Sequence, residues 1–352
     1  MSKSPKLSIM KKTLIVVGII VLLTLIITSL NVFRKIYSPN VVLSSKATDY
    51  VYIRTGSNLE DICNNLYENN FIVNRSSFEW LAEKKNLAIH IKPGRYKIQS
   101  GMSNNELVDL LRSGKQDPVR FSINNIRTIS ELAGHTSRCL EVDSAGLFQL
   151  LNDNEYLKQF GFNSYTAMAM FIPNTYKIFW NTNADEFIKR MYVEQQKFWN
   201  EHRIELSKSI GLTPTQVITL ASIVDDETNI SSEYAIIAGV YMNRLKHKIP
   251  LQADPTVKFA LGDFGIKRVL KKHTEIDSPY NTYKNLGLPP GPISMPSVKS
   301  IDAILNYEKH NYLYFCAKAD FSGYHTFAKT LSQHNQNANA YQKELNKRKI
   351  YN

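Results

Sequence analysis

Residues 213–228 read TPTQVITLASIVDDET, an apolar run that ends in three consecutive carboxylates. Thr213 is a good helix N-cap, Pro214 suits the first helical position, and Gln216 can complete a capping box. These signals predict a helix that starts here and carries the carboxylates in its last turn.

The three carboxylates are expected on different sides of this helix. At about 100° per residue, Glu227 falls between Leu220 and Ile223 on the apolar face, whereas Asp226 falls on the outer face. A carboxyl group against apolar walls has a raised pKa, and a Glu with a near-neutral pKa can donate a proton and take one back. Glu227 is therefore a candidate general acid and base. An acidic helix end with solvated carboxylates is the alternative.

The composition is that of a globular protein with room for two domains. The 352 residues are 43% hydrophobic, and the three cysteines lie far apart without a CxxC pair. This pattern argues against a disulfide framework and a zinc site. Half of the net charge of +12 belongs to residues 1–37, so the rest of the chain is only mildly basic. That charge suits an anionic polymer or a membrane surface and is not a nucleic-acid-binding stripe.

Residues 13–33 form an uncharged run that is long enough to span a bilayer as one helix. Four lysines precede the run and two basic residues follow it, which favours an N-terminus on the inside. No small-residue cleavage pattern follows, so we predict a retained anchor rather than a cleaved signal peptide or a core helix. The chain after Arg34 is then expected outside the cytoplasm.

Residues 47–120 contain a glycine turn followed by a short amphipathic helical pattern twice, at Gly56 and at Gly101. Strand patterns occur at 50–53 and 92–98. This arrangement resembles the LysM-like module of wall-binding proteins. A small α+β spacer without a ligand is the alternative.

The chain beyond residue 120 is mostly helical in pattern as far as residue 210. After the acidic helix come three loops rich in amide, hydroxyl and proline residues, a composition that suits sugar binding. They read LQADPTV (251–257), YNTY (280–283) and GLPPGPI (287–293). Residues 312–317 and 324–327 predict a strand pair, and a charged helix is expected from about residue 335.

Six motifs together carry a family resemblance. LASIVxxET (220–228), AGVYMNRL (238–245), the three loops above and HTF (325–327) occur in the order and spacing of the YceG-like family of endolytic murein transglycosylases. The resemblance covers about residues 13–345. It implies an α+β fold with a single N-terminal transmembrane helix, a LysM-like module and a mixed α+β catalytic domain. The expected boundaries are 1–12 for a cytoplasmic tail, 13–33 for the helix, 34–46 for a tether, 47–120 for the module and 121–352 for the catalytic domain.

The resemblance also assigns residues to the site. The family's catalytic Glu immediately precedes Thr in the first motif and corresponds to Glu227. Many members carry Glu where this chain has Asp225. The motifs imply no metal and no cofactor. The expected substrate-binding residues are Asn243, Gln252, Asp254, Thr256, Tyr280, Asn281, Tyr283 and His325.

The implied reaction is that of a lyase. It cleaves the β-1,4 bond between N-acetylmuramic acid and N-acetylglucosamine inside glycan strands and leaves 1,6-anhydromuramyl ends, which limits elongation of nascent strands. The implied partners are peptidoglycan strands, the membrane and peptidoglycan synthases, with no role for nucleic acid. The implied location is the cell inner (cytoplasmic) membrane, with one span and the catalytic domain on the outer side.

Two alternatives stay open at this point: a lysozyme-like muramidase, which makes reducing ends, and a non-catalytic wall-binding protein. A conventional glycosidase needs two carboxylates that flank the bond. Asp254 is the one loop acid near the motifs, and we interpret it as structural or substrate-orienting. A metal-dependent hydrolase has no support, because HExxH is absent and His325 and His334 lie in a stretch that is not expected to be helical.

Overall fold

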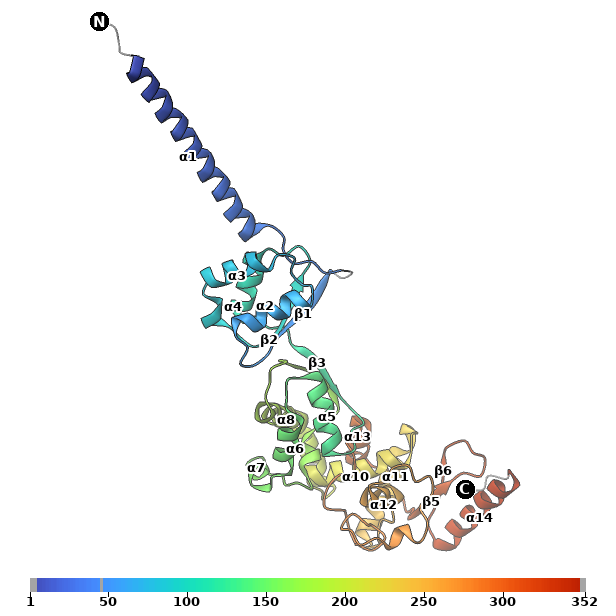
Figure 1. Cartoon of the computed structure of the whole chain (residues 1–352). Helices are drawn as coiled ribbons and strands as arrows, with labels where there is room; N and C mark the ends of the chain where they lie inside the picture. Colours follow the sequence, from blue (N-terminus) through green and yellow to red (C-terminus); the bar gives the residue numbers. More distant parts are fainter. Residues whose placement is uncertain (1–4, 45–46, 349–352) are drawn as a thin grey trace. The chain divides into compact units, whose positions relative to one another are not determined.

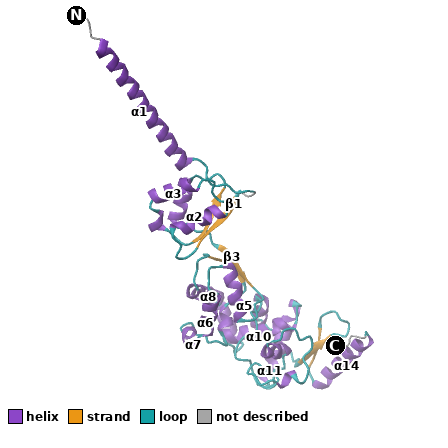
Figure 2. Cartoon of the chain, in the orientation of Figure 1, coloured by secondary structure: helices purple, strands orange, loops and turns teal. Residues whose placement is uncertain are grey.

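The computed structural model describes residues 5–44 and 47–348, and the chain divides into two compact units (Figure 1). The first comprises Met1–Val119 and Lys177–Asn181, and the second comprises Arg120–Tyr176 and Thr182–Asn352. Figure 2 shows that both combine helices with short strands, as expected for an α+β protein. The domain boundaries that the sequence suggested inside these units stay predictions.

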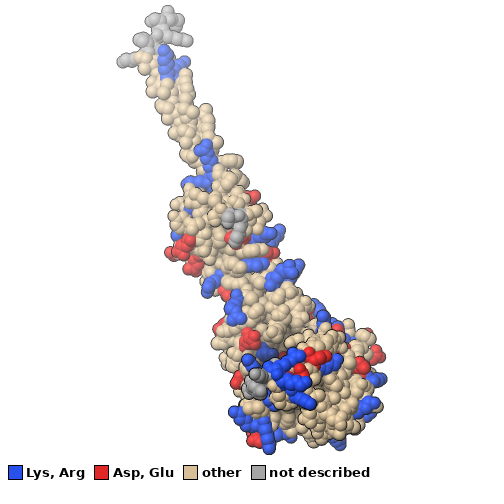
Figure 3. All heavy atoms as spheres, turned by 90° about the vertical axis from the view of Figure 1, so that its right-hand side faces the viewer, with Lys and Arg blue, Asp and Glu red and all other residues tan. Residues whose placement is uncertain are grey.

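The N-terminal helix α1 (Pro5–Tyr37) is exposed along its apolar length. Its segment Ile9–Tyr37 has a mean hydropathy of 2.8, and among the described residues it is the one helix long and apolar enough to cross a membrane. Figure 3 shows an uncharged stretch of this helix with basic side chains on either side. Length and composition are therefore compatible with the predicted span 13–33.

The first unit has its own core. Strand β1 (Thr48–Ile53) pairs antiparallel with β2 (Gly94–Gln99), so that Val51 lies opposite Tyr96. Both residues are fully buried against the helices. These helices are α2 (Leu59–Glu68), α3 (Arg75–Lys84), the 3₁₀ turn η1 (Leu87–His90) and α4 (Asn104–Ser113). The LysM-like identity of this unit stays a prediction.

The segment that follows is mostly helical, as its pattern predicted. Strands β3 (Val119–Ile123) and β4 (Asn174–Ile178) form the second two-stranded sheet. The helices are α5 (Ile129–Cys139), α6 (Ser144–Asn152), α7 (Asn154–Lys158), η2 (Ala167–Met170), α8 (Ala184–Phe198) and α9 (Glu201–Ser209).

The core of the second unit is built around α10 (Pro214–Glu227), the predicted acidic helix. Thr213 and Gln216 form the expected capping box, and every residue from Val217 to Val224 is buried. The helix packs chiefly against α11 (Tyr234–Lys246), α12 (Asp254–Leu261) and α13 (Val298–Leu305). The short turns η3 (Ser231–Glu233) and η4 (His273–Glu275) lie in the connecting loops.

The C-terminal part of the second unit consists of a strand pair and a helix. Strands β5 (Tyr314–Ala317) and β6 (His325–Ala328) pair antiparallel, which confirms the expected strand pair. Helix α14 (Leu331–Lys347) follows and packs against β5. It begins at Leu331 rather than near residue 335, because Thr330 caps it.

Candidate active site

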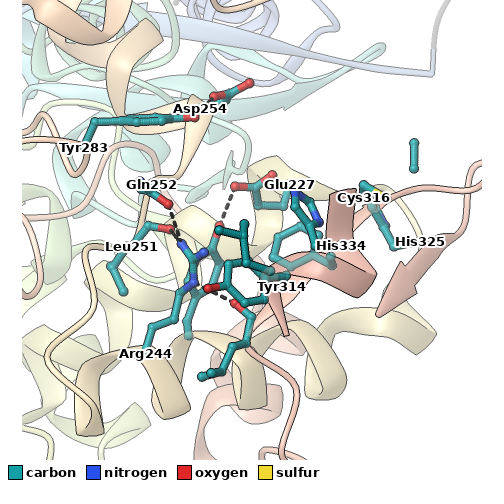
Figure 4. A pocket seen from close by; sticks show the side chains of 15 residues that line it. Glu227, Arg244, Leu251, Gln252, Asp254, Tyr283, Tyr314, Cys316, His325 and His334 are labelled. Carbon is teal, nitrogen blue, oxygen red and sulfur yellow. Dashed lines mark hydrogen bonds between the residues drawn. The ribbon is translucent and has the colours of Figure 1, made fainter. Parts of the chain in front are cut away.

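Glu227 is the last residue of α10, and its side chain is held by the neighbouring helix. The hydroxyl of Tyr241, on α11, donates a hydrogen bond of 2.5 Å to Glu227 Oε1 (Figure 4). Tyr241 is itself buried, packed edge-on against Phe315. A rigid phenol thus fixes the position of the carboxyl group.

The Glu227 carboxyl group opens onto a cavity of about 390 Å³. The walls come from α10, α11, the loop that enters α12, the 280–283 loop, the β5–β6 pair and α14, so residues far apart in sequence meet here. The polar side chains that concern the chemistry are Arg244, Gln252, Asp254, Tyr283, His325 and His334.

The surroundings of Glu227 bring its pKa to about 7, chiefly because burial disfavours the charged form. The Tyr241 hydrogen bond lowers the pKa, whereas the charges of Asp254 and Asp226 raise it and Lys258 lowers it. The direction agrees with the prediction from the helix face. Near neutral pH both protonation states are populated, as an acid that later acts as a base requires.

Asp226 does not lie on a solvent-facing side, and the prediction that it would is wrong. Its two oxygens accept hydrogen bonds of 2.6 and 3.1 Å from Arg127 Nη1 and Nη2, and its side chain is only 17% exposed. Burial raises the pKa of Asp226, and Arg127 opposes that shift. The helix count misplaced Asp226 because the segment before α5 covers this side of the helix end.

The side chain of Asp225 also makes a structural contact, with the start of another helix. Its oxygens accept hydrogen bonds from the backbone N–H and the hydroxyl of Ser297, at 3.1 and 2.7 Å. Ser297 is the N-cap of α13, so the pair ties the end of α10 to the start of α13. Asp225 and Asp226 are both engaged in such contacts, and Glu227 is the acid of this triplet that lines the cavity.

Four of the eight expected substrate-binding residues line the cavity: Gln252, Asp254, Tyr283 and His325. The Tyr283 hydroxyl donates to Asp254 Oδ1 at 2.5 Å. The His325 backbone N–H and its ring Nδ1 each lie 2.8 Å from an oxygen of the buried Glu233, which fixes the imidazole.

The other four do not line this cavity. Asn281 is fully buried and donates to the carbonyls of Thr274 and Ile276, and the buried Thr256 hydroxyl donates to the Ala253 carbonyl. Their polar groups make hydrogen bonds inside the loops and stabilise the loop conformations. Asn243 likewise donates to the carbonyls of His310 and Tyr312, and Tyr280 packs against Phe259. The contacts of these four residues are structural, so they are not assigned to substrate binding.

Sequence reasoning missed Tyr241, Arg244, Tyr314 and His334 as parts of the site. Arg244 is buried, donates to the carbonyls of Leu313 and Leu251, and lies over the Tyr314 ring. A Tyr and an Arg three positions apart in a mostly apolar helix were the available signal. His334 lies on α14 and not in a non-helical stretch, and its ring stacks on Tyr314.

The family model of the YceG-like family matches residues 51–340. This chain belongs to the YceG-like family. It is 30% identical to the endolytic murein transglycosylase of Bacillus subtilis, over 89% of this chain and 90% of that protein. It is 29% identical to the endolytic murein transglycosylase of Streptococcus pneumoniae serotype 2, over 78% of this chain and 55% of that protein.

A solved structure shows the same fold. The crystal structure of a YceG-like protein from Listeria monocytogenes superimposes with a TM-score of 0.53 at 31% identity, covering 83% of this chain and 99% of that one. In this YceG-like chain, no group of three metal-ligating side chains occurs within residues 5–44 and 47–348. The cavity instead offers one carboxyl group with a near-neutral pKa and a second carboxylate, Asp254.

Proposed function

We propose that the protein is an endolytic peptidoglycan lytic transglycosylase, with Glu227 as its general acid and base. The observation that carries the proposal is a carboxyl group of pKa about 7 that lines a cavity in a YceG-like chain. Curated relatives of this chain are named endolytic murein transglycosylases. The substrate is the β-1,4 bond between N-acetylmuramic acid and N-acetylglucosamine inside a glycan strand.

One carboxyl group can carry both halves of this reaction. Protonated Glu227 gives its proton to the glycosidic oxygen as the bond from that oxygen to the anomeric carbon breaks. The C6 hydroxyl oxygen of the muramic acid then attacks the anomeric carbon, and its proton passes to the Glu227 carboxylate. The ring closes without water, and the enzyme returns to its starting state. The Tyr241 hydrogen bond supports the carboxylate form between the two steps.

The remaining cavity residues suit a sugar. Gln252 and Tyr283 offer amide and phenol groups for hydrogen bonds, and His325 is held in one orientation by Glu233. We assign these three side chains to substrate binding. Arg244 donates to backbone carbonyls from Nε and Nη1, so we assign it the role of shaping the wall of the cavity.

Product analysis separates this reaction from hydrolysis by a lysozyme-like muramidase. Full-length protein in detergent would digest purified sacculi in ¹⁸O-labelled water, and the new glycan ends would be identified by mass. We expect anhydromuramyl ends that carry no label. Reducing ends with incorporated ¹⁸O would identify a hydrolase instead, and absence of cleavage under conditions where a known muramidase works would favour a wall-binding protein.

We further propose that α1 anchors the protein in the cytoplasmic membrane with the catalytic unit outside. The apolar helix and the lysines near its start support this orientation. Cleavage of strands close to their site of synthesis would limit their elongation and would bring the enzyme near peptidoglycan synthases. Protease added to spheroplasts should degrade the region after residue 40, and full protection of that region would contradict the orientation.

The first unit is proposed to hold glycan as a LysM-like module. A cavity of about 510 Å³ is present at the turn between β1 and α2. Its lining includes Tyr52, Arg54, Asp61, Asn64 and Asn65, a set of aromatic and hydrogen-bonding groups that suits a sugar.

A further inference from the structure

Asp254 is a second carboxylate in the cavity, and the proposed proton transfers do not use it. It is the first residue of α12, and Figure 4 shows it beside Tyr283, on a different wall of the cavity from Glu227. The Tyr283 hydroxyl donates to its Oδ1 at 2.5 Å. Within the described residues its Oδ2 accepts no hydrogen bond, so that oxygen is available to a ligand.

The surroundings of Asp254 stabilise a negative charge at this position. The N-terminal turn of a helix favours an anion, and a phenol donor strengthens the interaction. Burial, and next the hydrogen bond to Asp254, raise the pKa of Tyr283 far above its usual value, so the phenol stays a donor. The Asp254 charge also reaches Glu227, where it contributes to the raised pKa.

We propose that Asp254 is a second catalytic residue, whose carboxylate faces the muramic acid ring and stabilises the positive charge that develops as the glycosidic bond breaks. This inference rests on the proposed function. Charge on the anomeric carbon and the ring oxygen is greatest at the transition state, so a fixed carboxylate there lowers the barrier more than it strengthens substrate binding.

The two carboxyl groups, Glu227 and Asp254, then have different roles in the reaction. The electron pair of the breaking bond leaves with the glycosidic oxygen, which takes the Glu227 proton. Asp254 makes no bond and moves no proton; it offsets the charge until the C6 oxygen closes the ring.

The test compares full-length wild type, Asp254→Asn and Asp263→Asn in detergent on soluble glycan strands, with the anhydro ends counted. Asp263 is an exposed acid just beyond the other end of α12 and outside the cavity, so its variant matches the change in charge. We expect kcat of Asp254→Asn to fall about 10²–10³-fold with KM changed by less than about threefold. The remaining product should still carry anhydro ends, and Asp263→Asn should behave as wild type.

A pH profile separates a catalytic role from a structural one. Activity requires protonated Glu227, so the rate falls as pH rises through its pKa. Removal of the Asp254 charge makes ionisation of Glu227 easier, and the alkaline limb should move to lower pH in Asp254→Asn alone. The other titratable or charged groups near Glu227 or in its cavity are unchanged by this variant: Asp226, Tyr241, Arg244, Lys258, Tyr283, Tyr314, Cys316, His325 and His334.

Tyr283→Phe is the second variant, in case Asp254→Asn does not fold. It removes the donor to Asp254 but keeps the charge, and we expect about a 3- to 10-fold loss of kcat. Wild-type kcat in Asp254→Asn, or a loss without movement of the alkaline limb, would overturn the inference. Failure of the wild type itself to form anhydro ends would refute the proposed function instead, so the two failures are distinguishable.

Discussion

Glu227 owes its near-neutral pKa to the burial of its carboxyl group by the side chains around it. Burial moves its pKa to about 7, and the phenol of Tyr241 limits that rise by stabilising the carboxylate. The sequence placed Glu227 on the correct side of α10 because helical periodicity is local. It did not predict the contact between Glu227 and Tyr241, because that contact joins two helices.

Tyr241→Phe isolates that hydrogen bond. Loss of the donor destabilises the carboxylate, so the pKa of Glu227 should rise above its wild-type value. The alkaline limb of the rate profile should move to higher pH, and turnover should fall about 3- to 10-fold because the carboxylate is less well placed. Profiles of kcat/KM against pH for the two proteins measure this shift. An unmoved limb would show that Tyr241 does not act on Glu227.

The raised pKa also has a cost in stability. An unfolded Glu ionises near pH 4.5 whereas Glu227 holds its proton to about pH 7, so stability is lost as pH rises between these values. Glu227→Gln removes that penalty, and Gln can still accept the Tyr241 hydrogen bond. The variant should be more stable than wild type at pH 8, by up to about 3 kcal/mol, and equal to it near pH 4. Urea unfolding at both pH values tests this, and a variant less stable at pH 8 would contradict it.

Helix α10 shows which features of an element are readable from sequence. Its capping box and the strand pair β5–β6 follow from local patterns, and the structure has both. The contacts that orient its C-terminal half are not local: Ser222 accepts from the Ile293 N–H at 3.0 Å, and Asp226 pairs with Arg127. The amide of Asn281 looked like a sugar ligand for the same reason, since a loop's internal hydrogen bonds leave no sequence pattern.

The Asp226–Arg127 pair is expected to hold the end of α10 in place. Asp226→Asn should lower the free energy of unfolding by about 1 kcal/mol and reduce turnover only a few-fold. Arg127→Met should cost more, about 1–3 kcal/mol, because it leaves the less exposed carboxylate unpaired. A double-mutant cycle by urea unfolding measures the coupling. Strictly additive effects would mean that the pair does not contribute.

At the scale of the whole molecule, the chain combines an apolar helix with two units that each have a cavity. The order of these parts was predictable, because each has its own composition or motif. Whether the first unit binds glycan was not, since a glycine turn before a helix is common to binding modules and spacers.

A double substitution, Arg54→Ala with Asn64→Ala, tests the first unit's role. Both residues line its cavity, and their loss should weaken sacculus binding about 3- to 10-fold while cleavage of short soluble glycans stays normal. Lys84→Ala is the control, an exposed cation of the same unit outside that cavity. Binding by co-sedimentation measures the effect. Equal binding by all three proteins would favour a spacer.

In the proposed reaction one side chain, Glu227, carries the proton in both halves. The most direct measurement is the rate at which Glu227→Gln releases anhydromuropeptides from sacculi, with Glu201→Gln, an exposed residue of α9, as the matched control. Gln keeps the size and hydrogen-bonding capacity of Glu but cannot exchange a proton. We expect the rate to fall at least about 10²–10⁴-fold while the control cleaves normally. A folded Glu227→Gln variant that forms anhydro ends at near the wild-type rate would contradict the claim.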